Sequence, residues 1–471
     1  MSEKKRERFT EFTSSLLPHE VAYLDKIQKL KDPENIWILG RIRHYSNHPS
    51  ESCVFDPLID KRKYSYLKKW ITSKLEAIDA DHFFFWMAEI DKKIMTDAIN
   101  PDEEKALLSM INKFKDTSYY FVRFYELVQN YRYYLLIRMR YNYLKPIAAF
   151  LETWKASYQH SKNISQELHE ATMDIVDQYA SFNKESRQWE TRLIQIFRDE
   201  RLDGLNRYYA IVRLTFMYYN YKEYDKLIEL YNHLDQLIIE GLIYSKRILV
   251  NYYANRVLLH ARHNELEQAV FYGKLSIRFK GADYIFYVAN LCAVLLRSNK
   301  NQEALKLMQE NLSEMKNTIS PHNRIGFASY YIQSLTKNTK AQQALSYART
   351  FLELNRNDIL IFRWHLFFTS MLQAMFQLEK YADILKTIKK YDLLKLDTEH
   401  RKRAGHLPAI TWYYEVSSYK ECLIDESAML ATISDTAHNV LLDAHKSKLL
   451  KELIVEIKPH LSKIPYELTL L

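Results

Sequence analysis

A short pattern returns five times between residues 207 and 394, and it limits the possible folds more than any other feature of the chain. Each copy reads as two antiparallel helices joined by a polar turn, and each has one small or aliphatic anchor residue. The anchors are spaced by 42, 35, 40 and 40 residues: Leu227, Ala269, Ala304, Ala344 and Ile384. A loose period of this size is typical of helical solenoids, in which successive helix pairs stack on one another.

Glycine is scarce, which also favours an all-α fold. The 471 residues include only 7 Gly and 10 Pro, whereas 47% of the residues are hydrophobic. Sheets and phosphate-binding loops need glycine at their turns, so β and α/β folds are disfavoured. The hydrophobic content is ample for a core.

The turn into the second helix of three copies has the spacing of a capping box. In such a box the first side chain accepts a hydrogen bond from the third helical amide, and the third residue reaches back to the cap. The sequence therefore predicts that Asn264, Asn299 and Thr339 cap the second helices, opposite Glu267, Gln302 and Gln342.

Residues 207–394 resemble the tetratricopeptide-repeat superfamily. The matching positions are the anchors Ala269, Ala304 and Ala344 and the upstream apolar residues Tyr224, Leu266 and Tyr381. The usual first-helix glycine is replaced by Thr215, Val257, Cys292, Ile332 and Leu372, so the chain resembles a divergent member. The resemblance implies a right-handed superhelix whose concave face is lined by the first helix of each pair. It also implies partner binding without enzyme activity.

The rest of the chain is divided around this array. We expect a flexible N-terminus at 1–16, a helical N-terminal domain at 17–204, the array at 205–394, a basic linker at 395–406 and a helical C-terminal cap at 407–471. Three Asp-Pro or Asn-Pro pairs predict helix starts, at Pro33, Pro57 and Pro101. Pro146 is expected to end or kink a long aromatic helix over 118–145.

Polar side chains recur at fixed distances before the anchors. The positions fourteen and seven residues before an anchor lie on one face of a first helix, because seven residues are nearly two turns. We expect six of them to line a ligand groove: Arg213, Asn255, Asn290, Arg262, Arg297 and Lys337. The predicted ligand is an acidic protein segment, held by the cations and the amides. Alternatively, the cations end their helices and complement the helix dipole.

A second candidate surface is the segment 119–145, where eight Tyr are interleaved with Arg and Lys. Such a composition can stack on single-stranded nucleic acid. On a helical wheel, however, Arg123, Arg132, Arg138 and Arg140 surround the helix, which favours a buried helix with polar tips at the surface. Nucleic acid is therefore the alternative partner.

No motif indicates catalysis, a cofactor or a metal. P-loop, dinucleotide and nucleophile-elbow patterns do not occur, His169-Glu170 lacks the second His of a zinc protease, and the 16 His are scattered. Cys53, Cys292 and Cys422 are too far apart for a disulfide or zinc framework. No apolar run reaches the ~18 residues of a membrane span. The net charge of +9 permits an acidic partner. We expect a cytoplasmic, non-enzymatic scaffold without a membrane partner.

Overall fold

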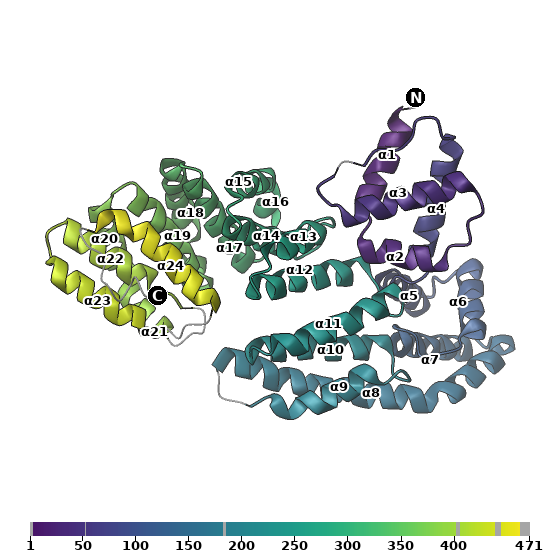
Figure 1. Cartoon of the computed structure of the whole chain (residues 1–471). Coiled ribbons are helices and arrows are strands. Elements are labelled where there is room, and N and C mark those ends of the chain that lie inside the picture. Colours follow the sequence, from purple (N-terminus) through teal and green to yellow (C-terminus); the bar gives the residue numbers. More distant parts are fainter. Residues whose placement is uncertain (1–2, 52, 182–184, 402–405, 439–443, 462–471) are drawn as a thin grey trace. The chain divides into compact units, whose positions relative to one another are not determined.

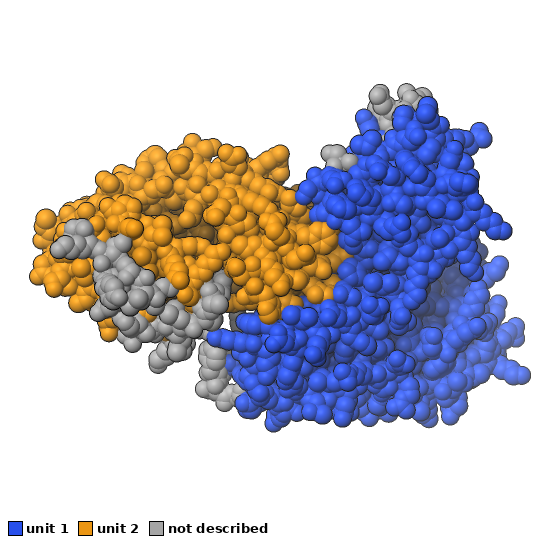
Figure 2. Space-filling model, viewed as in Figure 1, with its two compact units in different colours: residues 1–249 blue, residues 250–471 orange. Residues whose placement is uncertain are grey.

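The computed structural model describes residues 3–51, 53–181, 185–401, 406–438 and 444–461, and every regular element in these ranges is a helix (Figure 1). The predicted all-α class is therefore confirmed. None of the described helices combines the length and the apolar character that a membrane span requires. The chain divides into two compact units, residues 1–249 and 250–471 (Figure 2). This division falls inside the predicted array.

The first unit contains two hydrophobic cores in its N-terminal part. The first core joins the opening four helices through residues such as Phe9, Leu24, Ile38 and Leu67. Residues 1–16 were expected to be flexible, but α1 uses Phe9 to join this core. The helices are α1 (Glu3–Ser14), α2 (Pro18–Ile27), α3 (Pro33–Asn47) and α4 (Lys61–Glu76).

The second core lies among α5 (Ala80–Met95), α6 (Pro101–Lys113), α7 (Phe121–Ile137) and α8 (Leu144–Ser181). The unit continues with α9 (Glu190–Arg198), α10 (Gly204–Asn220) and α11 (Tyr224–Ile239), and it includes the short 3-10 helices η1 (Tyr141–Tyr143) and η2 (Arg187–Trp189). α10 packs on α8 and α9 as well as on α11.

Two of the three helix starts predicted at prolines are correct, those at Pro33 and Pro101. Asp32 and Asn100 accept backbone hydrogen bonds at the starts of α3 and α6. The prediction at Pro57 is wrong: α4 begins at Lys61 with Asp60 as its cap, and Asp56 instead accepts a hydrogen bond from the Leu58 amide.

The predicted helix over 118–145 is interrupted. α7 ends at Ile137, where Met139 has a positive φ of 54°, and the Arg140 amide donates to the Leu135 carbonyl. Pro146 then lies in the first turn of α8, where its missing N–H is not needed. α8 then continues without a break to Ser181, and Ser165 within it donates to Asn206 Oδ1.

The second unit is a succession of helix pairs in which several first helices pack both on their own pair and on the next first helix along the chain. α14 contacts α15 and α17, α17 contacts α18 and α19, and α19 contacts α20 and α22. Its helices are α12 (Lys246–Arg262, beginning in the first unit), α13 (Leu266–Ser276), α14 (Tyr284–Arg297), α15 (Asn301–Glu310), α16 (Leu312–Asn317), α17 (Pro321–Lys337), α18 (Ala341–Phe362), α19 (Trp364–Gln377), α20 (Tyr381–Lys390), α21 (Leu393–His400), α22 (Ala409–Lys420), α23 (Glu426–His438) and α24 (Ala444–Ile457), followed by η3 (Lys458–His460).

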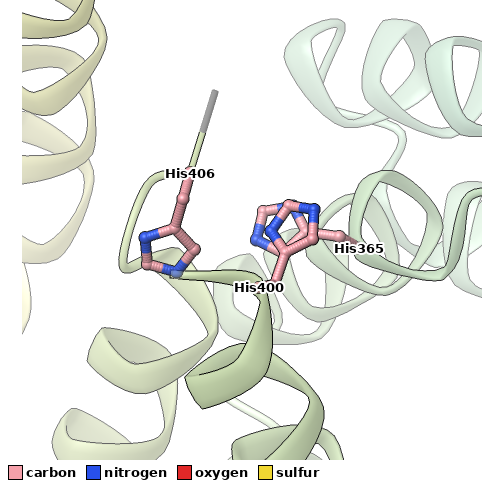
Figure 3. A group of neighbouring side chains, drawn as sticks. All are labelled: His365, His400 and His406. Atoms are coloured by element: carbon pink, nitrogen blue, oxygen red, sulfur yellow. The ribbon is translucent and has the colours of Figure 1, made fainter. Parts of the chain in front are cut away.

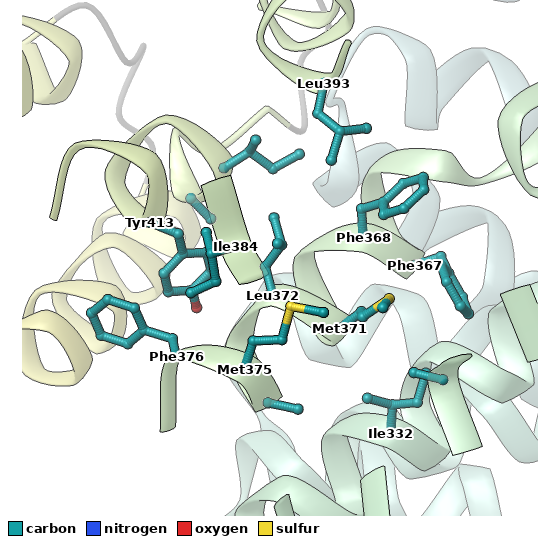
Figure 4. Close-up of a cluster of buried hydrophobic side chains, with 14 of the residues drawn as sticks. Ile332, Phe367, Phe368, Met371, Leu372, Met375, Phe376, Ile384, Leu393 and Tyr413 are labelled. Atoms are coloured by element: carbon teal, nitrogen blue, oxygen red, sulfur yellow. The ribbon is translucent and has the colours of Figure 1, made fainter. Parts of the chain in front are cut away.

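The anchors of the repeat are buried as predicted. Ala269, Ala304 and Ala344 are all 0% exposed. Ala344 belongs to a core of large apolar side chains that include Phe367, Met371 and Tyr413 (Figure 4). Ala269 and Ala304 belong to a second core, with apolar side chains such as Leu291 and Met308. A small anchor beside such side chains lets two helices approach closely, which a longer side chain would prevent.

The turn inside each pair differs from the predicted capping box. The residue five positions before each anchor has a positive φ of 54–61°, and the next amide bonds back to the carbonyl five residues before it, at 2.8–3.0 Å. This is the Schellman closure of a first helix. Asn264, Asn299 and Thr339 therefore close the first helices, and the N-cap residues of the second helices are Glu265, Lys300 and Lys340, whose side chains make no cap hydrogen bond.

The same closure occurs once more beyond the predicted array. Cys422 has φ of 58°, and the Leu423 amide donates to the Ser418 carbonyl at 2.8 Å. α23 then starts after Asp425, whose carboxylate accepts from the Ala428 amide. α22 and α23, expected to be part of a cap, are thus joined by a turn of the repeat type.

Candidate functional site

The six predicted groove residues lie on the first helices of four pairs, but in two different units. Arg213 belongs to α10 of the first unit. Asn255 and Arg262 are on α12, Asn290 and Arg297 on α14, and Lys337 on α17 of the second unit. One continuous surface for all six therefore stays a prediction.

Arg213 is tied into the first unit. Its Nε donates to the Leu168 carbonyl and its Nη1 to the Tyr209 carbonyl, both at 2.8 Å. Burial lowers the pKa of this guanidinium. Because two of its donors are used by backbone carbonyls, Arg213 fastens α8 to α10, and the ligand role predicted for it has little support.

Arg262 and Arg297 form a pair of like charges on neighbouring first helices. Arg297 Nη2 donates to the Ala261 carbonyl at 3.0 Å. Burial lowers the pKa of Arg297, the Glu452 carboxylate opposes this shift, and the charge of Arg262 adds to it. Arg262 itself is exposed. Two adjacent guanidinium groups with one carboxylate beside them form an anion-binding arrangement.

The Glu452 carboxylate lies on α24, and this helix also contacts the first helices α19 and α22. Glu456 of this helix accepts hydrogen bonds from Gln373 Nε2 of α19 at 2.7 Å and from the Tyr413 hydroxyl of α22 at 2.8 Å. Burial raises the pKa of Glu456, and Lys337 acts in the opposite direction. The positions predicted to face an acidic segment thus lie near two glutamates of the chain itself.

The two asparagines differ in their environment. Asn255 Nδ2 donates to Asn251 Oδ1 at 3.3 Å. Asn290 Nδ2 is buried and has no hydrogen-bond partner among the described residues. An unsatisfied buried donor costs about 1–3 kcal/mol, so the Asn290 side-chain N–H is suited to donate a hydrogen bond to a carbonyl of a ligand.

The aromatic segment 119–145 is mostly part of the core. Tyr119, Tyr125 and Tyr131 are buried, whereas Tyr133, Tyr141 and Tyr143 are exposed. Its arginines are largely paired: Arg123 with Glu126, Arg138 with Asp97 and Arg140 with Glu104. Since these charges are already neutralised, the segment offers little attraction to a nucleic-acid backbone.

A cluster of histidines is the feature that the sequence analysis missed. His365, His400 and His406 each place one ring nitrogen within 4.8 Å of the others, close enough to hold a metal ion (Figure 3). Asp397, fully buried, lies beside them. Burial alone would raise the pKa of Asp397, but His365 and His406 outweigh it and hold that pKa below its usual range. The spacing Asp397-x2-His400-x5-His406 was a usable local signal, because residues three apart share a helix face.

A scan of protein-family models, a search of curated proteins and a search of solved structures each found no match to this chain.

Proposed function

We propose that the protein is a non-enzymatic scaffold whose tetratricopeptide-like, right-handed solenoid binds an acidic protein segment along its first helices. The observation that carries this proposal is the Arg262–Arg297 pair with the Glu452 carboxylate beside it. Two like charges on adjacent helices repel each other, so an anion between or beside them is favoured. We regard Glu452 as the chain's own substitute for a carboxylate of the partner.

The solenoid part of the proposal is supported by the order of the helix contacts. The first helix α14 packs on α17, α17 on α19 and α19 on α22, and the second helices α13, α15, α18 and α20 each pack on the first helix that follows. Repeat proteins have this nearest-neighbour pattern. The recurring Schellman closure and the buried alanines give the pairs a common internal geometry.

The ligand-binding residues in this proposal are Asn255, Asn290, Arg262, Arg297 and Lys337. The arginines and the lysine would pair with carboxylates, and the unsatisfied Asn290 amide would bind a backbone carbonyl. Exposed charge pairs contribute only about 0.2–1 kcal/mol each. Removal of two arginines is therefore expected to weaken binding by about 2- to 30-fold.

The test uses the full chain with Glu452→Gln, which frees the arginine pair from its internal carboxylate. The probe is a fluorescent peptide with the sequence of residues 452–457, which contains two glutamates and no basic residue, and a control probe carries Gln in place of both glutamates. We expect the acidic probe to bind more tightly by fluorescence anisotropy, and the difference to shrink in 0.5 M salt because of screening.

Adding Arg262→Ala and Arg297→Ala to this chain should remove that preference. The matched control is Lys306→Ala with Arg349→Ala, which removes two exposed cations from second helices. If the arginine variant keeps the preference, or the control loses it equally, the arginines are helix-end residues and the proposal is wrong. Tighter binding of a single-stranded oligonucleotide than of the peptide would favour the nucleic-acid alternative.

A further inference from the structure

The three histidines come from three separate segments of the second unit. His365 is the second residue of α19, His400 is the last residue of α21, and His406 lies in the connection that leads into α22. His406 is buried, and the other two are half-buried. Residues far apart in sequence thus place imidazoles together away from bulk water.

We propose that His365, His400 and His406 bind one transition-metal ion of the zinc class, with Asp397 as the carboxylate that orients the ligands. Imidazole nitrogen suits Zn²⁺, and three histidines are a common zinc ligand set. Zn–N bonds of about 2.0–2.1 Å place ligand nitrogens about 3.3 Å apart. The ring nitrogens lie within 4.8 Å of one another, so a bound ion would require side-chain rotations that bring them closer together.

Asp397 has the hydrogen bonds of an orienting carboxylate. Its Oδ1 accepts from His406 Nε2 at 3.0 Å, and its Oδ2 accepts from the Thr411 hydroxyl at 3.1 Å. Donation through Nε2 leaves Nδ1 of His406 as the ring nitrogen available to a metal. Figure 3 shows this nitrogen on the side of the ring away from His365 and His400, so the imidazole would have to turn to present it to a shared ion. Metal-bound histidines commonly donate their other ring nitrogen to a carboxylate in this way.

The buried ring nitrogen of His365 is a second observation that favours a bound ion. Its Nε2 is buried and 3.4 Å from Asp397 Oδ1, yet it has no hydrogen bond with good geometry among the described residues. Its ring stacks on that of His400 with centroids 4.6 Å apart, and Figure 3 shows these two rings overlapping beside His406. Rotation of the His365 ring about its Cβ–Cγ bond would turn the buried Nε2 toward a shared ion and satisfy it.

A second histidine group provides a matched control. His44, His48 and Glu51 also lie within 4.8 Å of one another, but all three are exposed. Their atoms already bond within the group, since His44 Nε2 contacts Glu51 Oε2 at 2.9 Å and His48 Nδ1 contacts the His44 carbonyl at 2.8 Å. A histidine removed here should not affect the buried site.

The experiment measures metal binding to the full chain after treatment with a chelator. Zn²⁺ is titrated by calorimetry, and Co²⁺ is titrated by its visible absorption, which reports a tetrahedral site. We expect one equivalent of either ion in the wild type and in His48→Ala, and no such binding in His400→Ala. Asp397→Asn should keep the site with about 10- to 100-fold weaker affinity.

Two outcomes would overturn the proposal: a wild type that binds no more tightly than His400→Ala, or loss of the ion in His48→Ala. If circular dichroism shows that His400→Ala does not fold, His400→Gln replaces it, because the amide keeps a polar side chain of similar size. The zinc-dependent rise in melting temperature is compared in parallel. A rise that is equal in wild type and His400→Gln would also refute the site.

Discussion

Thr339 offers a direct test of the repeat turn. It is the only β-branched residue among those that close the first helices, yet its φ is 61°. A non-glycine residue in this left-handed region costs about 1–2 kcal/mol. Glycine removes this cost but adds about 0.4–1 kcal/mol of backbone freedom to the unfolded chain. Thr339→Gly should therefore stabilise the fold by about 0.5–1 kcal/mol.

Little else is lost in this substitution, because Thr339 is exposed and its hydroxyl bonds only to the adjacent Asn338 carbonyl. For a unit of residues 250–471, the gain corresponds to a rise in melting temperature of about 1–4 °C. The assay is thermal and urea unfolding followed by circular dichroism.

The matched control is Thr350→Gly, also an exposed threonine but inside α18. Glycine there should lower stability by about 0.3–1 kcal/mol, because it is a poor helix residue. A gain in stability for Thr339→Gly together with a loss for Thr350→Gly would support the Schellman closure at Thr339. Equal destabilisation by both would show that the left-handed conformation at Thr339 carries no strain, and the reasoning would fail.

Three other variants test the packing and the buried charges. Ala304→Leu should overpack the anchor and cost about 1–3 kcal/mol in urea unfolding; no loss would contradict close helix approach there. Arg140→Ala should leave the Glu104 carboxylate buried and cost about 2–3 kcal/mol, less than the ~3–5 of a fully buried pair because the Arg140 side chain is 36% exposed. Burial raises the pKa of Glu456, so the native state binds its proton more tightly, and stability should fall as the pH rises from about 4.3 toward the folded-state pKa. Glu456→Gln should remove this part of the pH dependence while keeping the Tyr413 hydrogen bond, and an unchanged pH profile would refute the assignment.

The sequence was sufficient where one local rule decides the structure. Ala269, Ala304 and Ala344 are small residues at a fixed distance from a polar turn, and this pattern predicted their burial. The spacing of Asn264 and Glu267 could not decide their roles, because asparagine is favoured both as an N-terminal cap and in the left-handed conformation. Because only a short connection joins the two helices, the first helix must end before the second can begin. Asn264 therefore takes the left-handed conformation that ends the first helix.

The candidate sites were harder to predict because they depend on distant segments. Arg213 has the same offset from its anchor as Asn255, but α8 packs on α10 and supplies the Leu168 carbonyl that binds it. Likewise, His365 precedes His400 by 35 residues, and only the packing of α19 near the end of α21 brings them together. No local spacing contains that information.

The constant turn has a practical consequence for engineering this protein. Spacing between successive turns varies, and the additional residues of α16, the long α18 and α21 all follow the start of a second helix. Part of this length variation thus lies in the connections that lead from one pair to the next, and the first helices also differ in length, with 14 residues in α14 and 17 in α17. A reporter peptide or a purification tag should be tolerated at exposed Ile319, between α16 and α17. The same insertion beside Asn299 would separate the two helices of a pair and prevent folding.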